Sequence, residues 1–378
     1  MKFMRAAAKA LLPVFPRSWW MGLAALPALA LGAPLYRAVD VGLVDGAEIT
    51  HVYDLGDRGD AVAYSGAVPV SWNATTGLVP IPQPQDDTRL LMIKAINATR
   101  ATAGTLHGPA GVPTQAVFVS PSRARSFFLR GTWAADSLDP VAPVKDLSNA
   151  NEVLGVSALP WLWSANAGLR AIGTHGSSEY KVNRLNDRSQ VAGYREVETS
   201  DDCSGQRAFV YDAPSGRFTP LDDGPPDIEQ NVCRRYSQAN GINEVGQVVG
   251  WAYEDDGGSD PRRPFIWSAS TGRRPLVSAD RRKVDLVPLD INDRGQVVGT
   301  FQYSDHVGAL KDRRFFYWDE AGGVVDLQDL LDPGDPMSGE VDLRTDDDNV
   351  RINADGVISA AGRLAGSKAT RAFILSPR

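Results

Sequence analysis

The feature that most constrains the fold is a short stretch that recurs along the whole chain. GINEVGQVVGW, Gly241–Trp251, returns almost unchanged as DINDRGQVVGT, Asp290–Thr300. When the Ile or Leu before the Asn is taken as position zero, the chain contains four clear copies and three weaker ones. Units of just under 50 residues are typical of propellers and other repeat architectures. Position zero falls at Leu55, Ile96, Leu147, Leu185, Ile242, Ile291 and Ile352.

Two further positions of the repeat carry a restricted set of residues. Position one is Asn in five copies, with Gly56 and Ser148 as departures. Asn favours a turn because its side chain bonds the backbone two residues later, and the Gly that follows tolerates the left-handed backbone of a bulged hairpin. We expect the small residue at position eight to make room for a bulky aromatic side chain or a neighbouring backbone. This residue is Ala63, Gly104, Gly155, Gly193, Gly250, Gly299 or Ala360.

A second motif follows each hairpin. It is an aromatic-rich strand such as RPFIWS, and in five units a Gly comes five residues after its last aromatic. These pairs are Trp72–Gly77, Trp163–Gly168, Tyr211–Gly216, Trp267–Gly272 and Trp318–Gly323. A short apolar strand comes next, so each unit has four strands, which we name A to D. Arg opens strand C at Arg207, Arg263, Arg314 and Arg371. We expect its stem to cover aromatic neighbours and its head to pair with a carboxylate.

Seven units of four strands predict an all-β fold, a seven-bladed β-propeller of four-stranded antiparallel blades. The 36 Gly and 25 Pro residues are in keeping with many tight turns. The last copy ends at RAFILSPR, a strand C with no strand D after it, while YRAVDVG at Tyr36–Gly42 precedes the first strand A. We predict that this N-terminal strand completes the last blade and removes two open sheet edges. Residues 33–378 then form one propeller domain.

These residues resemble the HAF-type extracellular repeat proteins of bacteria. The resemblance rests on the IN-x-x-GQVVG hairpin, the AF-x-W strand and the opening YRAVDVG, and it covers the chain from Tyr36 to the end. No repeat carries the His of the His-Ala-Phe triplet. Arg stands in its place in the last four units, and the first three units lack even that Arg. The resemblance implies export and a propeller-like fold, and it implies no catalytic residues, substrate or cofactor.

Residues 1–32 differ from the rest of the chain. They hold four basic residues and no acidic one, followed by an apolar run that ends in small residues. This pattern predicts a secretory signal peptide, and hence an extracellular or periplasmic protein. An uncleaved anchor is the alternative, but Pro13, Pro16 and Pro27 interrupt the run. Cleavage leaves 35 basic against 46 acidic residues, a net charge of −11. This negative charge disfavours nucleic-acid binding. No later apolar run is long enough to cross a membrane, which disfavours membrane insertion.

The topology predicts two unlike faces. The A–B and C–D turns share one end of the blades and are short and uniform, so we expect that face to be scaffold. The B–C and D–A loops share the other end and vary widely, and variable loops on a rigid scaffold commonly bind ligands. Candidate binding residues on that face are Arg234, Arg235, Arg262 and Glu254. Asp255, Asp256 and Asp260 are weak candidates for Ca²⁺, because their spacing matches no known calcium loop; we predict no other cofactor.

Catalytic signals are sparse. The four histidines belong to different units, and no nucleophile elbow, P-loop or zinc motif is present. The sequence therefore favours a monomeric binding or structural module for an extracellular or envelope glycan or protein. The alternative is a propeller hydrolase or lyase that acts on a polysaccharide or similar polymer.

The two cysteines of the chain, Cys203 and Cys233, lie in connections of adjacent units that the strand count places on the same variable face. An exported protein with an even pair of cysteines normally forms a disulfide. We therefore predict a Cys203–Cys233 bridge, with two free surface thiols as the alternative.

Overall fold

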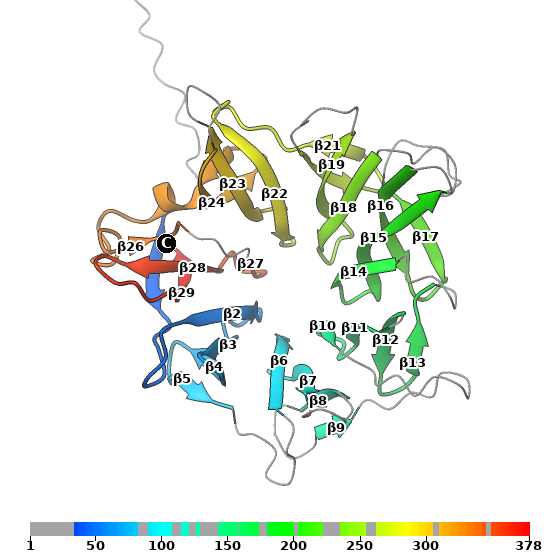
Figure 1. Ribbon diagram of the computed structural model, residues 1–378, viewed down its shortest axis with the longest axis horizontal. Coiled ribbons are helices and arrows are strands. Elements are labelled where there is room, and N and C mark those ends of the chain that lie inside the picture. Colours follow the sequence, from blue (N-terminus) through cyan, green and yellow to red (C-terminus); the bar gives the residue numbers. More distant parts are fainter. Residues whose placement is uncertain are drawn as a thin grey trace, which may run out of the picture.

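A computed structural model describes residues 34–81, 90–107, 115–120, 126–128, 143–157, 159–173, 180–199, 203–221, 235–254, 262–304, 310–344 and 349–378. The regular secondary structure of these residues is β-strand, apart from one short 3-10 helix, η1 (Leu327–Leu330). The strands make antiparallel sheets arranged around a common axis (Figure 1). The all-β prediction and the four-stranded antiparallel unit are therefore confirmed.

Four of the sheets contain four strands each, in sequence order. The first two are β2 (Thr50–Leu55), β3 (Ala61–Ser65), β4 (Val68–Asn73), β5 (Gly77–Pro80) and β6 (Leu90–Ile96), β7 (Thr102–His107), β8 (Gln115–Val119), β9 (Ser126–Phe128). The other two are β10 (Val144–Leu147), β11 (Val153–Val156), β12 (Pro160–Ser164), β13 (Gly168–Ala171) and β22 (Lys283–Ile291), β23 (Val297–Ser304), β24 (Leu310–Asp319), β25 (Gly323–Asp326).

Two sheets are larger. An eight-stranded sheet joins two units of four strands through one parallel pair, Gln206↔Tyr236, between β16 and β18. Its strands are β14 (Tyr180–Leu185), β15 (Gln190–Thr199), β16 (Cys203–Asp212), β17 (Arg217–Pro220), β18 (Arg235–Ile242), β19 (Val248–Glu254), β20 (Arg263–Ser268) and β21 (Gly272–Pro275). A five-stranded sheet contains β26 (Val341–Asp342), β27 (Val350–Ile352), β28 (Ile358–Leu364), β29 (Arg371–Pro377) and the N-terminal β1 (Tyr36–Asp40).

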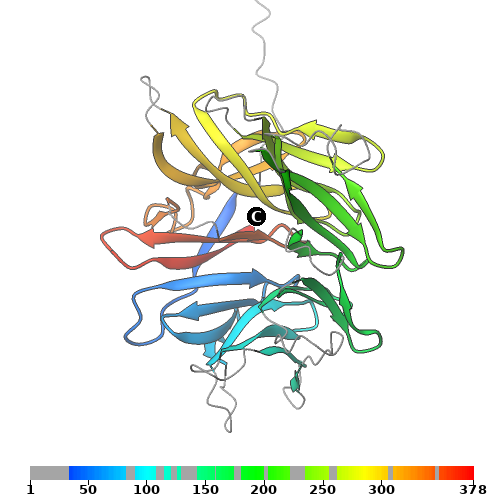
Figure 2. The ribbon, with the colours of Figure 1, turned by 45° about the vertical axis from the view of Figure 1, so that its right-hand side comes forward.

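The two ends of the described chain meet in the five-stranded sheet. Strand β1 pairs antiparallel with β29 from Tyr36↔Pro377 to Asp40↔Phe373, and Figure 2 shows it crossing behind β29. On its other side, the backbone N–H of Asp332 donates to the Tyr36 carbonyl (2.8 Å), and the N–H of Ala38 donates to Asp335 Oδ2 (2.9 Å). The N-terminal strand is therefore held between β29 and the segment that follows η1.

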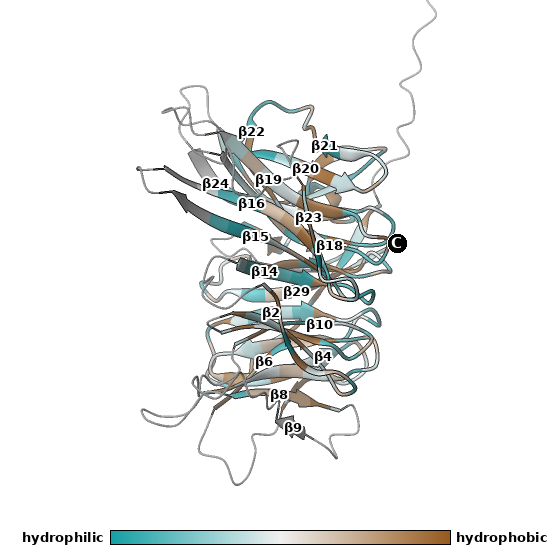
Figure 3. Ribbon diagram, turned by 90° about the vertical axis from the view of Figure 1, so that its right-hand side faces the viewer, coloured by the Kyte–Doolittle hydropathy of each residue, from teal (hydrophilic) through white to brown (hydrophobic). Residues whose placement is uncertain are grey.

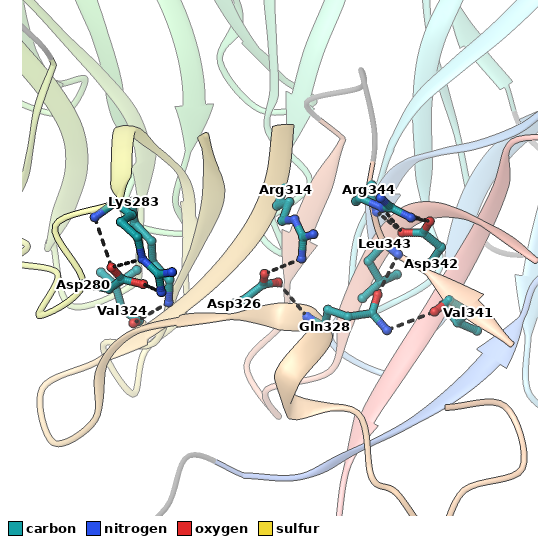
Figure 4. Close-up of polar contacts among 11 residues, drawn as sticks. Asp280, Lys283, Arg314, Val324, Asp326, Gln328, Val341, Asp342, Leu343 and Arg344 are labelled. Carbon is teal, nitrogen blue, oxygen red and sulfur yellow. Dashed lines mark hydrogen bonds and ion pairs between the residues drawn. The ribbon is translucent and has the colours of Figure 1, made fainter. Parts of the chain in front are cut away.

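That segment is itself fixed by side chains. Gln328 in η1 donates from Nε2 to the Val341 carbonyl and accepts from the Leu343 N–H at Oε1, both at 2.9 Å (Figure 4). In the same region Arg314 Nη1 lies 2.9 Å from Asp326 Oδ2, and Arg371 pairs with Asp40. These pairs confirm, for the two units concerned, the predicted carboxylate partner of the repeated Arg.

Each unit turns its first strand toward the axis, where β2, β6, β10, β14, β18, β22 and β27 surround the centre (Figure 1). In six of these strands the pairing register shifts between positions minus three and minus one, for instance between Val52 and Asp54. Such a bulge leaves position minus two without a cross-strand partner and re-aims its side chain.

The core lies between neighbouring sheets. One cluster combines Val62 of β3 with Leu91 and Ile93 of β6, and another joins Ala103 of β7 with Trp161 of β12; all five are at most 4% exposed. Seen from the side, the strands carry both hydrophobic and hydrophilic stretches (Figure 3). Each sheet therefore buries apolar side chains against its neighbours while polar residues remain for the axis and the turns.

The small residue at position eight fills the role expected of it. A Cβ atom built on Gly104, Gly193, Gly250 or Gly299 would lie 1.9–2.3 Å from a backbone oxygen of the adjacent strand A. The same atom on Gly193, Gly250 or Gly299 would also press on the ring of Phe209, Phe265 or Phe316. Position eight is small because backbone and aromatic ring both occupy the space of a side chain.

Substituting Gly250 by Ala is expected to lower the free energy of unfolding by about 1–3 kcal/mol, since the new Cβ would lie 1.9 Å from the Gln238 carbonyl oxygen. Gly339→Ala is the matched control, because a Cβ added at Gly339 would have no atom within 4 Å, and it should change stability by no more than about 0.5 kcal/mol. Urea unfolding of both variants measures the difference. Equal effects at the two positions would contradict the steric explanation.

Candidate functional site

Position one of the repeat links each unit to the next around the axis. Asn243 Nδ2 donates to the Asn292 carbonyl (2.9 Å), and Asn292 Nδ2 donates to the Asn353 carbonyl (3.0 Å). The same bond runs from Asn97 to Ser148, from Asn186 to Asn243 and from Asn353 to Gly56. The sequence pattern assigned these Asn residues to the turn alone, which is half of their role. The Asn243 Oδ1 atom does accept from its own turn, at the Gln247 N–H (2.8 Å).

Position two forms a second ring, which carries negative charge. The Asp187 N–H donates to Glu244 Oε2 and the Glu244 N–H donates to Asp293 Oδ1, both at 2.8 Å. The Ala354 N–H bonds Asp57 Oδ1 in the same way (3.3 Å). We call Asp57, Asp187, Glu244 and Asp293 the acidic rim. In these three bonds, the carboxylate is held by the backbone of the preceding unit.

Position minus one places buried charges one layer deeper. Asp54, Asp146 and Asp290 each accept the position-zero N–H of the next unit, from Ile96 (2.9 Å), Leu185 (2.8 Å) and Ile352 (3.1 Å) respectively. Arg184 lies among these carboxylates, with Nη1 3.4 Å from Asp146 Oδ1 and Nε 4.0 Å from Asp290 Oδ1. Arg351 occupies the same position in the last unit. We call these five residues the axial cluster.

The charges of the axial cluster act strongly on one another. Burial raises the pKa of Asp54 to about 6, with Asp146 adding to the effect and Arg184 opposing it. Burial acts to lower the pKa of Arg184, but the carboxylates of Asp146, Asp290 and Asp54 overcome it and raise the pKa above its usual value. Burial and the charge of Arg184 lower the pKa of Arg351 to about 10. Arg184 is therefore the cation around which the buried carboxylates are organised.

Within the described residues, two guanidinium nitrogens of the cluster, Arg184 Nη2 and Arg351 Nε, are buried and have no hydrogen-bond partner. Buried polar groups of this kind are rare unless water or a ligand satisfies them. They show that the axis holds more donor capacity than the surrounding protein uses.

A cavity of about 140 Å³ opens along the axis at the end of the A–B turns. Its walls are the axial cluster, apart from Arg351, the acidic rim, and four of the position-one Asn residues, which are Asn97, Asn243, Asn292 and Asn353. We call this cavity the axial pocket. The A–B turn face, which we expected to be scaffold, therefore also carries a charged pocket, on which the uniform turns converge.

The surroundings of Glu244 change the pKa of its carboxyl group. Burial, followed by the charge of Asp187, raises its pKa from 4.5 to about 7, with Asp293 and Asp57 adding to the effect. Its carboxyl binds more protons in the folded than in the unfolded state between these two values. Ionisation of Glu244 therefore destabilises the folded state: the penalty is absent below about pH 4.5 and grows as the pH rises from about 4.5 through about 7.

Glu244→Gln is expected to remove this pH dependence, because Gln keeps an acceptor for the Asp187 N–H and cannot ionise. Glu244 is partly exposed, so solvent screening reduces the effect to about 1–2 kcal/mol. The variant should be more stable than wild type by that amount at pH 8 and equally stable at pH 4.5, as measured by urea unfolding. Parallel stability curves for the two proteins across this range would show that Glu244 is not the titrating group.

The structure describes part of the predicted binding face. Arg262 Nη1 lies 3.2 Å from Asp285 Oδ1, and its guanidinium lies over the Trp251 ring at 5.0 Å from the centroid. Arg235 begins β18 and Glu254 ends β19, but their side chains lie outside the described residues. Arg234 and the calcium candidates Asp255, Asp256 and Asp260 also lie outside them, as do Cys233 and the side chain of Cys203.

Within the described ranges, no group of three or more His, Cys, Asp or Glu side chains is arranged to hold a metal ion. No helix in that part of the chain has the length and apolar character needed to cross a membrane.

Comparison with known proteins identifies the fold. No protein-family model and no curated protein matches the sequence. Among solved structures, the β-propeller domain of the Trilobed protease from Pyrococcus furiosus is similar at a TM-score of 0.53 and 9% identity, over 87% of this chain and 94% of that one. A structure from a study of two prolyl endopeptidases is similar at 0.50 and 9% identity, over 91% of this chain and 50% of that one. A streptogramin B lyase is similar at a TM-score of 0.49 and 8% identity, over 91% of this chain and 98% of that one. The chain is a β-propeller module.

Proposed function

We propose that this chain is an exported binding module, built on a seven-bladed propeller, that holds its ligand at the axial pocket. The observation that carries the proposal is the arrangement of the axial cluster and rim, whose carboxylates are fixed by backbone N–H groups around one open cavity. Fixed charges in a preformed cavity orient a polar ligand at little reorganisation cost.

The blade count rests on the repeat. The eight-stranded sheet supports two blades, since a single parallel pair, Gln206↔Tyr236, joins its halves. Counted in this way, each of the seven repeat copies corresponds to one blade, and residues 33–378 form a single domain. We further propose that β1 acts as the closing strand of the last blade, and that the chain is a HAF-type repeat protein exported by residues 1–32.

Export leads to a prediction about the two cysteines. Cys203 begins β16 and Cys233 precedes β18 by two residues in the sequence, and these two strands pair at Gln206↔Tyr236. We propose that the two sulfur atoms come within the reach of a disulfide. The bridge would close 31 residues and stabilise by about 3–4 kcal/mol as an upper value. Thiol titration of the denatured protein, purified from the periplasm without reductant, should find no reactive thiol and two after reduction. Two thiols before reduction would exclude the bridge.

Occluding the axial pocket tests the binding function. Ala354 lies at position two of the last unit and lines the axial pocket with only a methyl group. Ala354→Trp should therefore fill the opening of the pocket, while the backbone N–H of residue 354 still bonds Asp57. Mature protein is screened on glycan and envelope-protein arrays, and ligands found are titrated against this variant. Affinity should fall at least 10-fold, whereas Ala321→Trp, an exposed C–D turn substitution, should bind as wild type. A ligand that binds Ala354→Trp with the wild-type affinity would show that it does not bind in the axial pocket.

A propeller hydrolase or lyase acting on a polysaccharide is the second candidate. Glu244, with a pKa raised to about 7, has the acidity of a general acid and stands at the mouth of the pocket. Incubation with a panel of polysaccharides distinguishes the two functions. Turnover that Glu244→Gln abolishes would favour the enzyme, and stoichiometric binding without product would favour the module.

A further inference from the structure

Three carboxylates of the acidic rim belong to three successive units. Asp187, Glu244 and Asp293 occupy position two of these units, and each is fixed at one oxygen. The Asn149 N–H donates to Asp187 Oδ1 at 2.5 Å. The Asp187 N–H donates to Glu244 Oε2 and the Glu244 N–H to Asp293 Oδ1, both at 2.8 Å. We call these three carboxylates the acidic arc. Their order around the axis is set by backbone hydrogen bonds.

The acidic arc lacks a counter-cation in the part of the chain that the structure describes. There, the second oxygen of each arc carboxylate has neither a hydrogen-bond nor an ion-pair partner. Arg294 follows Asp293 but pairs with Asp355 instead, at 3.5 Å from Nη2 to Oδ1. The fourth rim carboxylate differs, because Asp57 Oδ2 accepts from Asn149 Nδ2 (3.0 Å). The arc therefore presents negative charge and free acceptors to whatever enters the pocket.

The arrangement of the arc suits an ammonium group better than a metal ion. A calcium or magnesium ion needs several oxygen ligands around one point, at about 2.0–2.6 Å, and the carboxylates that the structure describes are not grouped in that way. An ammonium group donates three separate hydrogen bonds, which can reach separate carboxylates. Such bonds are strong because both partners are charged.

A second cavity, of about 290 Å³, adjoins the arc and shares Asp293 with the axial pocket. We call it the side pocket. Two of its charged wall residues neutralise each other, since Arg274 Nη1 donates to Glu320 Oε1 at 3.1 Å. Its apolar wall residues are Val245, which is 54% exposed, Ile266 and Trp318. A molecule bound at Asp293 therefore has an apolar surface beside it.

The axial pocket also offers a donor. Arg184 lines the pocket, and its Nη2 atom is buried without a hydrogen-bond partner among the described residues. Its other guanidinium nitrogens face Asp146 and Asp290. A ligand that reaches this depth is expected to carry an oxygen acceptor for Nη2, since buried donors are rarely left unpaired.

We propose that the acidic arc binds the primary ammonium group of an organic molecule whose apolar group occupies the side pocket. This inference rests on the proposed function, because it names the chemical class that the axial pocket takes. Charge-assisted hydrogen bonds to the arc and burial of the apolar group both contribute to affinity. Two sources supply this chemistry. One is a simple aromatic amine, and the other is the N-terminal residue of a polypeptide, whose carbonyl oxygen would also accept from Arg184 Nη2.

Phenethylammonium chloride tests the arc and the side pocket together, and ethylammonium chloride tests the arc alone. Both are titrated by calorimetry at pH 8, where Glu244 is ionised. Wild type should bind phenethylammonium saturably, and ethylammonium more weakly by about 10-fold. Asp293→Asn keeps an acceptor for the Glu244 N–H but loses the charge, so it should weaken the binding of both amines by about 10-fold.

Two further variants complete the test. Val245→Ser should weaken phenethylammonium binding and leave ethylammonium binding unchanged, because it alters only the apolar wall. Asp45→Asn is the matched control for Asp293→Asn, since Asp45 is an exposed aspartate outside both pockets, and it should bind both amines as wild type does. The melting temperature of each variant verifies that it is folded.

L-Phenylalaninamide identifies the source, because it adds a carbonyl oxygen to the same ammonium and phenyl groups. Tighter binding than that of phenethylammonium indicates the N-terminal residue of a polypeptide, and equal or weaker binding indicates a simple amine. The inference is overturned if no amine binds wild type, if Asp293→Asn binds them equally well, or if ethylammonium matches phenethylammonium. That failure is separate from failure of the module, since a ligand from the arrays that Ala354→Trp rejects would still establish axial binding.

Discussion

Replacing Arg184 by Met should lower the free energy of unfolding by about 3–5 kcal/mol, among the largest effects of any single substitution in this chain. The guanidinium lies beside Asp146 and Asp290, and its charge also lowers the pKa of Asp54. Asp54 and Asp146 are only 8% and 6% exposed. Met would leave these carboxylates buried without their central cation, so they must either protonate or remain charged at high cost.

The matched control is Arg274→Met, which removes an exposed ion pair, Arg274 Nη1 to Glu320 Oε1 at 3.1 Å. It should cost no more than about 1 kcal/mol, since water screens such pairs. Chemical denaturation at pH 7 compares the two variants. A second arm at pH 4 should shrink the Arg184→Met deficit, because protonation then neutralises the carboxylates that lost their cation. Similar losses for both Arg variants would mean that Arg184 does not organise the cluster.

The repeat made the strand plan predictable from sequence. Three patterns are local, because in each of them a residue type is required by the backbone geometry of a single unit. They are the Asn-x-x-Gly turns, the five-residue spacing after the aromatics and the small residue at position eight. Gly250 illustrates this, because its neighbours Gln238 and Phe265 belong to the same unit. The strands therefore follow from patterns that fit within about 50 residues.

The axial pocket was not predicted, because its contacts join residues of different units. Asn243 bonds Asn292, and Asp146 meets Arg184, across distances that no local pattern encodes. A signal was nevertheless present. Once the copies are aligned, position minus one is charged in five of seven units, inside a strand that should bury apolar side chains. The bulge next to this position became visible only in the pairing register.

Deleting Tyr36–Gly42 tests the proposed closing role of β1, and we expect the free energy of unfolding to fall by about 5 kcal/mol or more. Tyr36 is fully buried and Ala38 is 5% exposed, in one apolar cluster with Phe373 and Leu375 of β29. The deletion removes this burial and leaves one edge of β29 unpaired. Calorimetric melting should shift to lower temperature.

The same deletion should change the association state, because an unpaired strand edge invites pairing with another chain. Light scattering should detect oligomers of the truncated protein, and an added YRAVDVG peptide should restore both the melting temperature and the monomer. Val39→Ser is the control, since Val39 in β1 is 46% exposed and its substitution should leave pairing intact. A truncated protein that melts with wild type and stays monodisperse would show that β1 does not close the propeller.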